Sequence, residues 1–354
     1  MTKNDFIVDF DDLLLITGSN GFIGSKVVET LLSYGFRNLR CFIRPSSDIT
    51  ALKRILESRN DTTGVQVIEG NLLSRDDCEK AAKGAYVIYH LAAGSEKSFA
   101  GAYMNSVVTT RNLLDMVVHH NCIKRFVNVS SFCVYSKINM KRGGLLDETC
   151  GMETRPGQRG EAYCYGKVKQ EELLIEYGKK YALPYVILRP GAVFGPGKKE
   201  ITGRVGIGTF GVFLHLGGSN RIPFTYVDNC AEAVVLAGLK EGIDGEVFNI
   251  VDSQLPTSRD FLRMYKTHVG HFKSIYVPKM ASYFLCYLWE KYSEWSNGQM
   301  PPIFNRNRWC SDWKGSQYSN VKLRELLGWK PRVSYSEASK RYFEYCKEMD
   351  KKNA

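Results

Sequence analysis

The sequence lacks the features that mark three common classes of protein. Its ten cysteines contain no CxxC pair, and its six histidines stand in no cluster with cysteines or acids, so we predict neither a metal site nor a disulfide framework. We find no basic leader followed by a long apolar segment, and no apolar run near the ~20 residues that cross a bilayer. These absences predict a cytoplasmic protein with reduced thiols and no membrane insertion.

The charge is one-sided, because 48 lysines and arginines outnumber 37 acids and leave a formal net charge of +11. The basic residues are nevertheless dispersed, and no basic helix or aromatic RNA-reading motif accompanies them. We therefore expect no nucleic-acid partner. The positive surplus instead favours attraction of anionic small molecules, such as the phosphates of a dinucleotide.

Near the N-terminus an apolar segment, residues 13–16, leads into three glycines spaced three apart, Gly18, Gly21 and Gly24, and a helical pattern follows. The first glycine permits a tight turn, the second lets the backbone approach phosphates, and the third lets the helix pack closely on the sheet. The helix N-terminus then offers N–H groups to a diphosphate. This order predicts a dinucleotide site, and its alternative is a strand-to-helix turn without a ligand.

Strand-like and helix-like segments alternate from residue 12 to about 190, which is typical of a parallel sheet covered on both faces. The predicted class is α/β, a Rossmann-type doubly wound parallel sheet with a smaller C-terminal substrate lobe. We assign residues 1–190 to the dinucleotide-binding domain and 191–354 mainly to the substrate lobe, with some segments returning to the sheet. The expected strands are 12–17, 38–43, 65–69, 85–90, 124–130 and 184–189, and the expected helices are 23–34, 49–58, 76–82, 97–120 and 162–181.

Beyond residue 190 the pattern is less regular. Glycines crowd residues 203–218, which we interpret as a mobile loop. The segment 280–295 is rich in Tyr, Phe, Leu and Trp, and it fits a core helix of the lobe, a wall of an apolar pocket or a shallow membrane anchor. Because it lacks a strongly basic polar face, core or pocket wall is favoured. The helices expected in this half are 230–239, 257–267, 280–294 and 335–348.

Tyr163 and Lys167 stand four residues apart and share one face of the helix predicted at 162–181. An ammonium group beside a phenol favours the phenolate, so we expect Lys167 to lower the pKa of Tyr163 from ~10. A phenol tuned in this way passes a proton to or from an alcohol oxygen. Ser130 and Ser131 end a predicted strand, where a hydroxyl can hold the substrate oxygen. Each pattern alone also fits exposed helix residues or a serine-rich turn.

Taken in order, the motifs resemble those of the extended short-chain dehydrogenases/reductases, in the branch with nucleotide-sugar epimerases and dehydratases, 3β-hydroxysteroid dehydrogenases and dihydroflavonol-type reductases. The resemblance covers nearly the whole chain. Asn71, Thr109 and Asn229 depart from the family pattern, which has Asp, a frequent Gly and Asp there. The matching segments are TGxxGxxG at 17–24, NL at 71–72, HLAA at 90–93, the helix pattern at 105–114, SSxxVY at 130–135, YxxxK at 163–167, RPxxVFGPG at 189–197, YVDNxA at 226–231 and GWKP at 328–331.

The resemblance implies roles for individual residues. Ser131, Tyr163 and Lys167 are the catalytic group, in which Tyr163 is the general acid/base and Lys167 also hydrogen-bonds the nicotinamide ribose. It further implies a homodimer through a four-helix bundle of the helices 97–120 and 162–181. The predicted cofactor-binding residues are Gly18, Asn20, Gly21, Phe22, Ile23, Gly24, Arg44, Asn71, Leu72, Leu91, Ala92, Ala93, Val129, Tyr163, Lys167, Pro190 and Val193.

The end of the second predicted strand distinguishes NAD from NADP. An acid there accepts the ribose hydroxyls of NAD and repels a 2′-phosphate. This chain has Arg44 instead, followed by Ser46 and Ser47, and Arg44 offers a planar guanidinium to a phosphate. NADP(H) is therefore favoured over NAD(H), and a solvated arginine or one stacked on adenine is the alternative.

Two reactions compete for the predicted site and its small-molecule substrate. One is hydride transfer between NADP(H) and a ketone/aldehyde or alcohol, and the other is redox-neutral epimerisation of a nucleotide sugar. Gly191 stands where sugar-nucleotide members often carry Asn, and no Asp-Glu pair follows Ser131 as in dehydratases, so net redox is favoured. A binding protein without chemistry is disfavoured because the catalytic group is retained. The basic residues that are either substrate contacts or solvated charges are Arg142, Arg155, Arg159, Lys198, Arg204 and Arg221.

Overall fold

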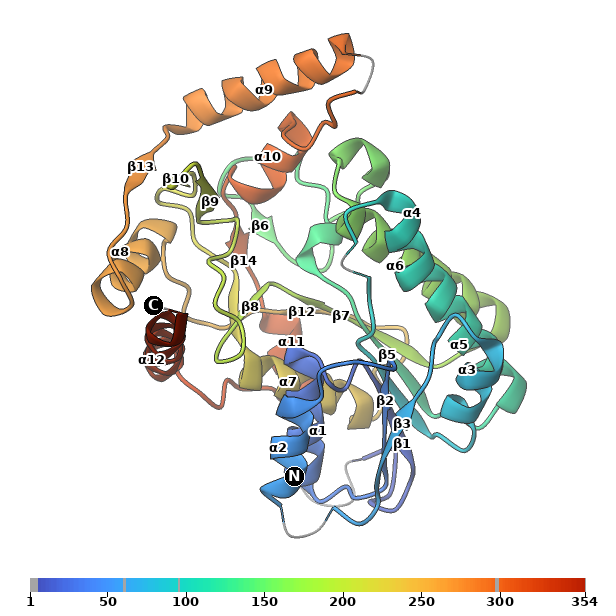
Figure 1. Ribbon diagram of the computed structural model, residues 1–354. Helices are drawn as coiled ribbons and strands as arrows, with labels where there is room; N and C mark the ends of the chain where they lie inside the picture. Colours follow the sequence, from blue (N-terminus) through green and yellow to red (C-terminus); the bar gives the residue numbers. More distant parts are fainter. Residues whose placement is uncertain (1–5, 60–61, 95, 297–298, 354) are drawn as a thin grey trace.

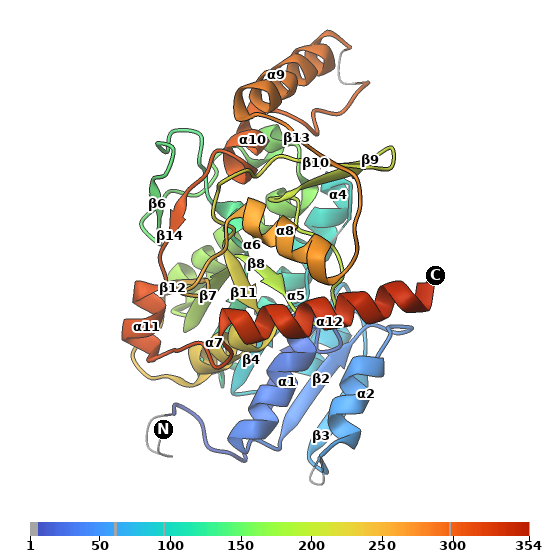
Figure 2. The same ribbon diagram turned by 90° about the vertical axis from the view of Figure 1, so that its left-hand side faces the viewer.

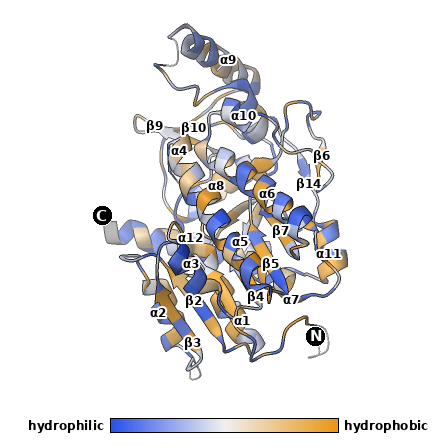
Figure 3. Cartoon of the chain, turned by 90° about the vertical axis from the view of Figure 1, so that its right-hand side faces the viewer, coloured by the Kyte–Doolittle hydropathy of each residue, from blue (hydrophilic) through white to orange (hydrophobic). Residues whose placement is uncertain are grey.

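A seven-stranded, wholly parallel sheet forms the centre of the molecule, as the computed structural model shows for residues 6–59, 62–94, 96–296 and 299–353 (Figure 1). Most of its strands are short apolar runs that bury both faces between layers of helices (Figure 3). In sheet order they are β12 (Val247–Ile250), β7 (Tyr185–Pro190), β5 (Arg125–Val129), β4 (Val87–His90), β1 (Leu14–Thr17), β2 (Leu39–Ile43) and β3 (Val65–Glu69).

The chain reverses its direction of travel across the sheet at β1. From β1 it proceeds through β2 to the edge strand β3, and then returns to the other side of β1 to form β4, β5 and β7. Such a switch point leaves a crevice at the carboxyl ends of the strands, where ligands of doubly wound sheets bind. The predicted α/β class and the six predicted strands are confirmed, and β12 comes from beyond residue 190.

Helices cover both faces of the sheet and separate two apolar cores. Trp329 is fully buried in the core on the α1 side, where its indole N–H donates to the Asn229 carbonyl (3.0 Å). The opposite core lies between the sheet and α5 and α6. The first face carries α1 (Phe22–Tyr34), α2 (Thr50–Glu57), α7 (Val227–Leu239) and α11 (Val321–Leu327), and the second carries α3 (Arg75–Ala82), α5 (Thr109–His120) and α6 (Ala162–Tyr181).

The helix predicted at 97–120 is continuous but not uniform. It begins as α4 (Phe99–Ala102), widens into a π-helical segment at Tyr103–Val108 and continues as α5. Wider turns of this kind recur at functional sites. Here the widened segment brings Asn105 and, one residue beyond it, Thr109 to the wall of the cleft described below.

The C-terminal half builds a lobe over the carboxyl edge of the sheet (Figure 2). An aromatic cluster that includes Phe224, Phe261 and Tyr342 forms its core. The remaining elements are β6 (Leu145–Leu146), β8 (Ala192–Phe194), β9 (Gly206–Thr209), β10 (Val212–His215), β11 (Phe224–Tyr226), α8 (Ser258–His268), β13 (Ser274–Tyr276), α9 (Lys279–Trp295), α10 (Arg306–Asp312), β14 (Gln317–Tyr318) and α12 (Tyr335–Asn353).

The prediction of a mobile loop at 203–218 is wrong. β9 and β10 form an antiparallel hairpin within it, and β13 adds a parallel third strand. The turn between them uses Phe210 and Gly211, which both have positive φ angles. The glycines therefore shape a hairpin turn instead of an irregular segment, and the short apolar run of β10 supplies the pairing strand.

The interpretation of 280–295 as a core helix is wrong, whereas the pocket-wall alternative holds in part, because Met280, Tyr283 and Ser293 line a cavity of about 1080 Å³ that is separate from the cleft described below. The segment is helical, but α9 fully buries only its small residues Ser282, Cys286 and Ser293. Tyr283 is partly buried against Trp309, and most of the other large side chains of α9 are exposed. It projects from the lobe far from the sheet (Figures 1 and 2). The composition indicated a helix, but it did not indicate how little of that helix the neighbouring α10 covers.

Three further observations concern the described part of the chain. None of its helices has both the length and the apolar character needed to cross a membrane. Its histidines, cysteines and acids form no group of three or more with metal-binding geometry. All ten cysteines are free thiols.

Candidate active site

Two adjoining cavities form a continuous cleft at the carboxyl edge of the sheet. Their volumes are about 520 Å³ and 240 Å³, and they share Gly18, Gly21, Leu91 and Ala93 as common walls. The larger cavity extends under the lobe, and the smaller one extends toward the ends of β2 and β3. A long ligand that crosses the glycine turn can therefore occupy both.

At Gly18 and Gly21 the glycine turn has no side chain between its backbone and the cleft, so a ligand can approach the backbone closely there. Gly18 has a φ angle of +69°, and a Cβ atom on it would lie 3.0 Å from the Ala92 nitrogen. A Cβ atom on Gly24 would lie 2.0 Å from the Gly18 carbonyl oxygen. The helix α1 starts after Gly21 with no side-chain cap and no acid in its first turn. This bare helix N-terminus at the cleft matches the requirements of a dinucleotide diphosphate.

The smaller cavity carries polar groups but no acid among its described lining residues. Arg44 is exposed at its rim, directly after β2. Ser47 lines it, whereas Ser46 does not. The Asn71 side-chain oxygen accepts the Leu73 N–H (3.0 Å), so Asn71 shapes the turn that closes the cavity. The electrostatics of this end therefore favour an anion.

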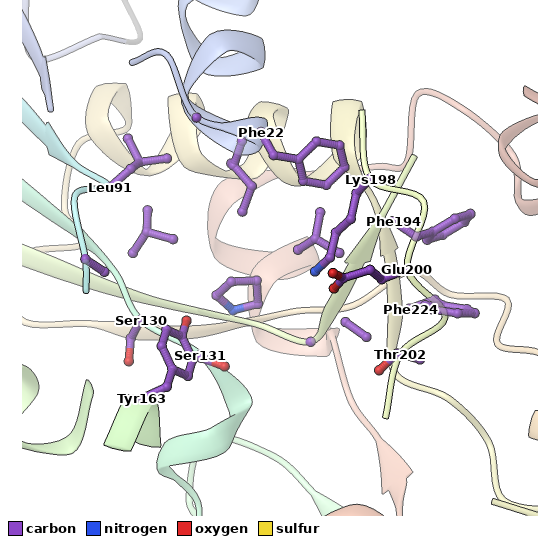
Figure 4. A pocket seen from close by; sticks show the side chains of 18 of the residues that line it. Phe22, Leu91, Ser130, Ser131, Tyr163, Phe194, Lys198, Glu200, Thr202 and Phe224 are labelled. Atoms are coloured by element: carbon purple, nitrogen blue, oxygen red, sulfur yellow. The ribbon is translucent and has the colours of Figure 1, made fainter. Parts of the chain in front are cut away.

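The larger cavity brings the predicted catalytic residues together. Ser131 follows β5, and its hydroxyl oxygen accepts the Cys133 N–H (3.2 Å). Tyr163 projects from the first turn of α6 into the same cavity, where its side chain lies beside Ser131 (Figure 4). Lys167 lies one helical turn further, is almost fully buried and also lines the cavity. Two hydroxyls and an ammonium group thus face one space.

The expected lowering of the Tyr163 pKa is not found. The pKa of Tyr163 is raised, because burial of its hydroxyl disfavours the phenolate, and the neighbouring Cys133 acts in the same direction. The ammonium group of Lys167 does not contact the phenol and donates to the Val129 carbonyl (2.6 Å) and to Gln170 Oε1 (2.9 Å). Burial lowers the pKa of Lys167 to about 8. Tyr163 therefore stays protonated at neutral pH, which suits a general acid.

A buried chain of hydrogen bonds connects Lys167 to the glycine turn. Gln170 Nε2 donates to Thr110 Oγ1 (2.8 Å), and Thr110 Oγ1 lies 2.9 Å from His90 Nε2. His90 Nδ1 lies 2.8 Å from Thr17 Oγ1, next to Gly18. All five side chains are almost fully buried. This series of hydrogen bonds links Lys167, at the catalytic end of the cleft, to Thr17, beside the glycine turn.

The hydrogen bond from Thr110 to Ser106 determines which groups donate and which accept along this series of hydrogen bonds. The Thr110 hydroxyl donates to the Ser106 carbonyl (2.5 Å), so its oxygen accepts from both Gln170 and His90. His90 consequently carries its proton on Nε2 and accepts the Thr17 hydroxyl at Nδ1. Burial and the charge of Lys167 lower the pKa of His90 to about 3, which keeps the ring neutral. Gln170 can then present only its carbonyl oxygen to Lys167.

A buried ion pair fixes α6 against the sheet. Arg189 on β7 donates through Nε and Nη2 to Glu171 on α6 (3.1 Å and 2.5 Å to its nearest oxygens), and both side chains are at most 4% exposed. The Arg189 guanidinium also lies 4.6 Å from the centre of the Tyr135 ring. Arg189 therefore holds the helix that carries Tyr163 and Lys167, and it does not line the cleft.

All the predicted catalytic and cofactor-binding residues line one of the two cavities. Of the basic residues proposed as substrate contacts, Lys198 lines the larger cavity (Figure 4). Arg204 donates instead to the Ser311 carbonyl (3.1 Å), and Arg221 donates to the Leu255 carbonyl (2.9 Å). Arg159 is buried against the Cys133 carbonyl (2.6 Å). Neither Arg142 nor Arg155 is among the described lining residues of either cavity.

Sequence reasoning missed other residues of the site. Glu200 and Thr202 extend into the larger cavity from the segment after β8 (Figure 4), and no recognised motif covers that segment. Asn105 and Thr109 line the smaller cavity, and their helix motif was noted without a role in the cleft. Gln170 was missed because its partners, Thr110 and His90, are distant in sequence.

Comparisons with known proteins show which family and which folds this chain resembles. The model of the "NAD dependent epimerase/dehydratase family" matches residues 14–251. A 3beta-hydroxysteroid-dehydrogenase/decarboxylase isoform 2 of Arabidopsis thaliana is 26% identical over 92% of this chain, which spans only 60% of that relative's length. A decarboxylating sterol-4-alpha-carboxylate 3-dehydrogenase of Mus musculus is 23% identical over 92% of this chain and 88% of its own. The crystal structure of UDP-glucuronic acid 4-epimerase from Bacillus cereus with UDP-glucuronic acid and NAD has a TM-score of 0.71, at 23% identity over 95% of this chain and 99% of its own.

Proposed function

We propose that this chain, which belongs to the NAD dependent epimerase/dehydratase family, is an NADP(H)-dependent oxidoreductase that interconverts a ketone or aldehyde and an alcohol. The observation that carries the proposal is the convergence of Ser131, Tyr163 and Lys167 at one end of a cleft whose other wall is the glycine turn. The site residues, and not the fold, support this function, because the same fold serves many reactions.

The residues present fit a dinucleotide. Gly18 and Gly24 leave room where any side chain would collide with the backbone, and the uncapped start of α1 suits the diphosphate. Arg44 and Asn71 would hold the adenosine end, and Pro190, Val193 and Lys167 would border the nicotinamide end. When bound, the nicotinamide would exchange a hydride with the substrate carbon.

The chain's own residues handle the substrate oxygen. In the direction of reduction, Tyr163 donates its proton to the carbonyl oxygen, which is consistent with its raised pKa. Ser131 donates a hydrogen bond to the same oxygen and orients it. Lys167 does not contact the phenol, but it keeps positive charge at the wall of the cavity below about pH 8, which favours transient negative charge on oxygen atoms inside the cavity.

Arg44 supports the preference for NADP(H). It is the charged residue at the end of β2, and no acid stands among the described residues that line this part of the cleft. A bidentate guanidinium–phosphate contact is worth roughly 1.5–3 kcal/mol. A ribose with free hydroxyls gains no such contact from Arg44.

Net redox chemistry has further support among the relatives. The dehydrogenases of Arabidopsis thaliana and Mus musculus align with 92% of this chain. The curated relatives named for UDP-sugar or dTDP-sugar reactions align with 67–71% of it. Gly191 also replaces the Asn that sugar-nucleotide enzymes of this type often carry. A 3β-hydroxysteroid is therefore a suitable first substrate to test.

A redox-neutral nucleotide-sugar epimerase is the second candidate. Lys198 favours it, because its ammonium group extends into the larger cavity, where a substrate diphosphate would need a cation (Figure 4). Glu200 lines the same cavity and disfavours a second anion there. The two other cations considered for a diphosphate, Arg204 and Arg221, already donate to backbone carbonyls.

Calorimetric titration separates the two candidates. UDP, dTDP and GDP are each titrated into the protein saturated with NADP, with Lys198→Ala as the matched variant. The oxidoreductase proposal expects no binding of any diphosphate, together with NADPH formation when a 3β-hydroxysteroid and NADP are supplied. Tight binding of one nucleotide that is lost in Lys198→Ala would replace the proposal with the epimerase.

We also propose a cytoplasmic homodimer that pairs the outer faces of α4 to α6. Ten free thiols suit a reducing compartment. Phe99 and Met104 support the pairing, since they are 40% and 44% exposed on the helix that would form the bundle. Sedimentation is expected to give a dimer for the wild type and a monomer for Met104→Glu. A monomeric wild type at micromolar concentration would contradict the proposal.

A further inference from the structure

The helix α9 contacts the rest of the molecule through one face, which combines the apolar contacts of Cys286 and Tyr283 with polar contacts. Trp309 on α10 donates its indole N–H to the Ser282 hydroxyl (2.9 Å), and the Ser293 hydroxyl donates to the Met300 carbonyl (2.5 Å). Glu290 pairs with Arg306 at the start of α10 (2.9 Å). The helix therefore has defined contacts on one side, and it stands clear of the sheet and the cleft (Figures 1 and 2).

Its opposite face is apolar and exposed. Met280 and Trp295, near its two ends, are 80% and 77% exposed, which is unusual for side chains of this size. The helical period of 3.6 residues places these side chains within one face. The exposed large residues of this apolar face are Met280, Phe284, Leu285, Leu288, Tyr292 and Trp295.

A basic cavity lies at the other end of the same segment. Arg259, Arg263 and Lys266 of α8 line a cavity of about 410 Å³, and no acid is found among its described lining residues. Asp260, on the neighbouring position of α8, pairs with Arg263 and leaves the other two cations without a carboxylate partner in this cavity.

The connection between the cavity and the helix is also exposed. β13 joins α8 to α9, and its Ile275 and Tyr276 are 58% and 46% exposed. The Arg259 guanidinium lies 5.9 Å from the centre of the Tyr276 ring. The segment from α8 to α9 thus presents cations, aromatic rings and aliphatic side chains in succession on the surface.

We propose that α8, β13 and α9 form a docking surface for a bilayer that contains anionic phospholipids. The helix α9 lies in the plane of the bilayer with its apolar face in the boundary between headgroups and acyl chains, where Trp and Tyr are favoured. The basic cavity of α8 binds headgroup phosphates. Such docking is peripheral and places α9 on the membrane, not across it.

Charge decides between a bilayer and a second copy of this chain. A copy docked on this surface would bring its own Arg259, Arg263 and Lys266 toward those of this chain, and like charges at an interface repel. An anionic lipid surface instead neutralises these cations. It also accepts the apolar face of α9 without requiring a complementary groove in a partner.

Vesicle binding tests the proposal on the full chain. The protein is sedimented with vesicles of phosphatidylcholine alone and with vesicles that also contain phosphatidylserine. We expect binding to the mixed vesicles, weakened by added salt because the charge contribution is screened. The double variant Phe284→Glu/Leu288→Glu is expected to lose at least tenfold in binding, and Arg259→Gln/Lys266→Gln should lose binding to the anionic vesicles.

The matched control is Leu326→Glu, since Leu326 is a 43% exposed leucine on α11, away from α9. It should bind vesicles like the wild type, and all variants should bind NADPH equally because none of these residues lines the cleft. Failure of the wild type to bind mixed vesicles would overturn the proposal. A dimer that Phe284→Glu/Leu288→Glu converts to a monomer would overturn it too, because a second copy would then occupy the face.

Discussion

The helices α6 and α9 contain similar proportions of tyrosine and leucine but occupy opposite environments. α6 packs against the sheet and the π-helical segment, and its Leu174 and Glu171 are fully buried. α9 buries three small residues and exposes its Leu288 and Trp295. The difference shows that the burial of an aromatic helix depends on which other elements pack against it. α6 holds chemistry in place, whereas α9 is free to contact something outside the molecule.

Removal of the proton donor on α6 is expected to have the largest effect. Tyr163→Phe should lower kcat about 10²- to 10⁴-fold, the usual contribution of a positioned general acid. NADPH binding should stay nearly unchanged. Tyr165→Phe is the matched control, because Tyr165 packs on Phe99 and Tyr103 and does not line the cleft. Turnover that survives in Tyr163→Phe would show that another group donates the proton.

Ion pairs on the two helices provide the next comparison. Glu171→Gln leaves Arg189 buried without its counter-charge, so the free energy of unfolding should fall by about 3–5 kcal/mol. Glu290→Gln on α9 should change it by only about 0–1 kcal/mol, since Arg306 is 42% exposed to water. Urea unfolding measures both, and equal losses would mean that α9 is as firmly packed as α6.

Leucine truncation makes the same distinction without charge. Leu174→Ala on α6 removes a fully buried side chain and should cost about 2–5 kcal/mol of unfolding free energy. Leu288→Ala on α9 should stay within about 0.5 kcal/mol, because Leu288 is 45% exposed. Thermal unfolding checks the pair. A large loss for Leu288→Ala would reveal a partner already covering α9 in the purified protein.

The smallest expected effect concerns Gln170, a positioning residue behind Lys167. The rate of reduction should fall as pH rises through about 8, where Lys167 loses its charge. Gln170→Leu removes a hydrogen bond to the ammonium group, so the pKa of Lys167 should drop, kcat/KM should fall about tenfold and the alkaline limb should move to lower pH. Gln170→Glu should move the limb to higher pH. A purely structural role would lower the rate without moving the limb in opposite directions.

The N-terminal half could be predicted well because its signals are local. The glycine turn needs only residues 17–24 to be recognised, and the pair Tyr163 and Lys167 shares a helix face by spacing alone. The contacts among Lys167, Gln170, Thr110 and His90 depend instead on elements far apart in the chain. Spacing predicted that Lys167 would act directly on Tyr163, but packing turns its ammonium group toward Gln170 and Val129.

The structure of the second half was harder to predict because it depends on contacts within the lobe between segments that are distant in sequence. The glycines of 203–218 were interpreted as a loop, although Gly211 serves a hairpin turn. Composition identified α9 as a helix, but exposure is decided by neighbours such as α10, which come from other parts of the sequence. The entry of Glu200 and Thr202 into the cleft has the same origin, since the segment after β8 is positioned by the lobe.

The preference of the cleft between NADPH and NADH is the most direct test of the proposed NADP(H)-dependent function. Fluorescence titration of each dinucleotide into the wild type and Arg44→Ala gives four dissociation constants. If Arg44 recognises the 2′-phosphate, the wild type binds NADPH at least about tenfold more tightly than NADH, and Arg44→Ala loses this preference while its affinity for NADH stays the same. Equal affinity for the two dinucleotides in the wild type, or an equal loss of both in Arg44→Ala, would contradict the proposal.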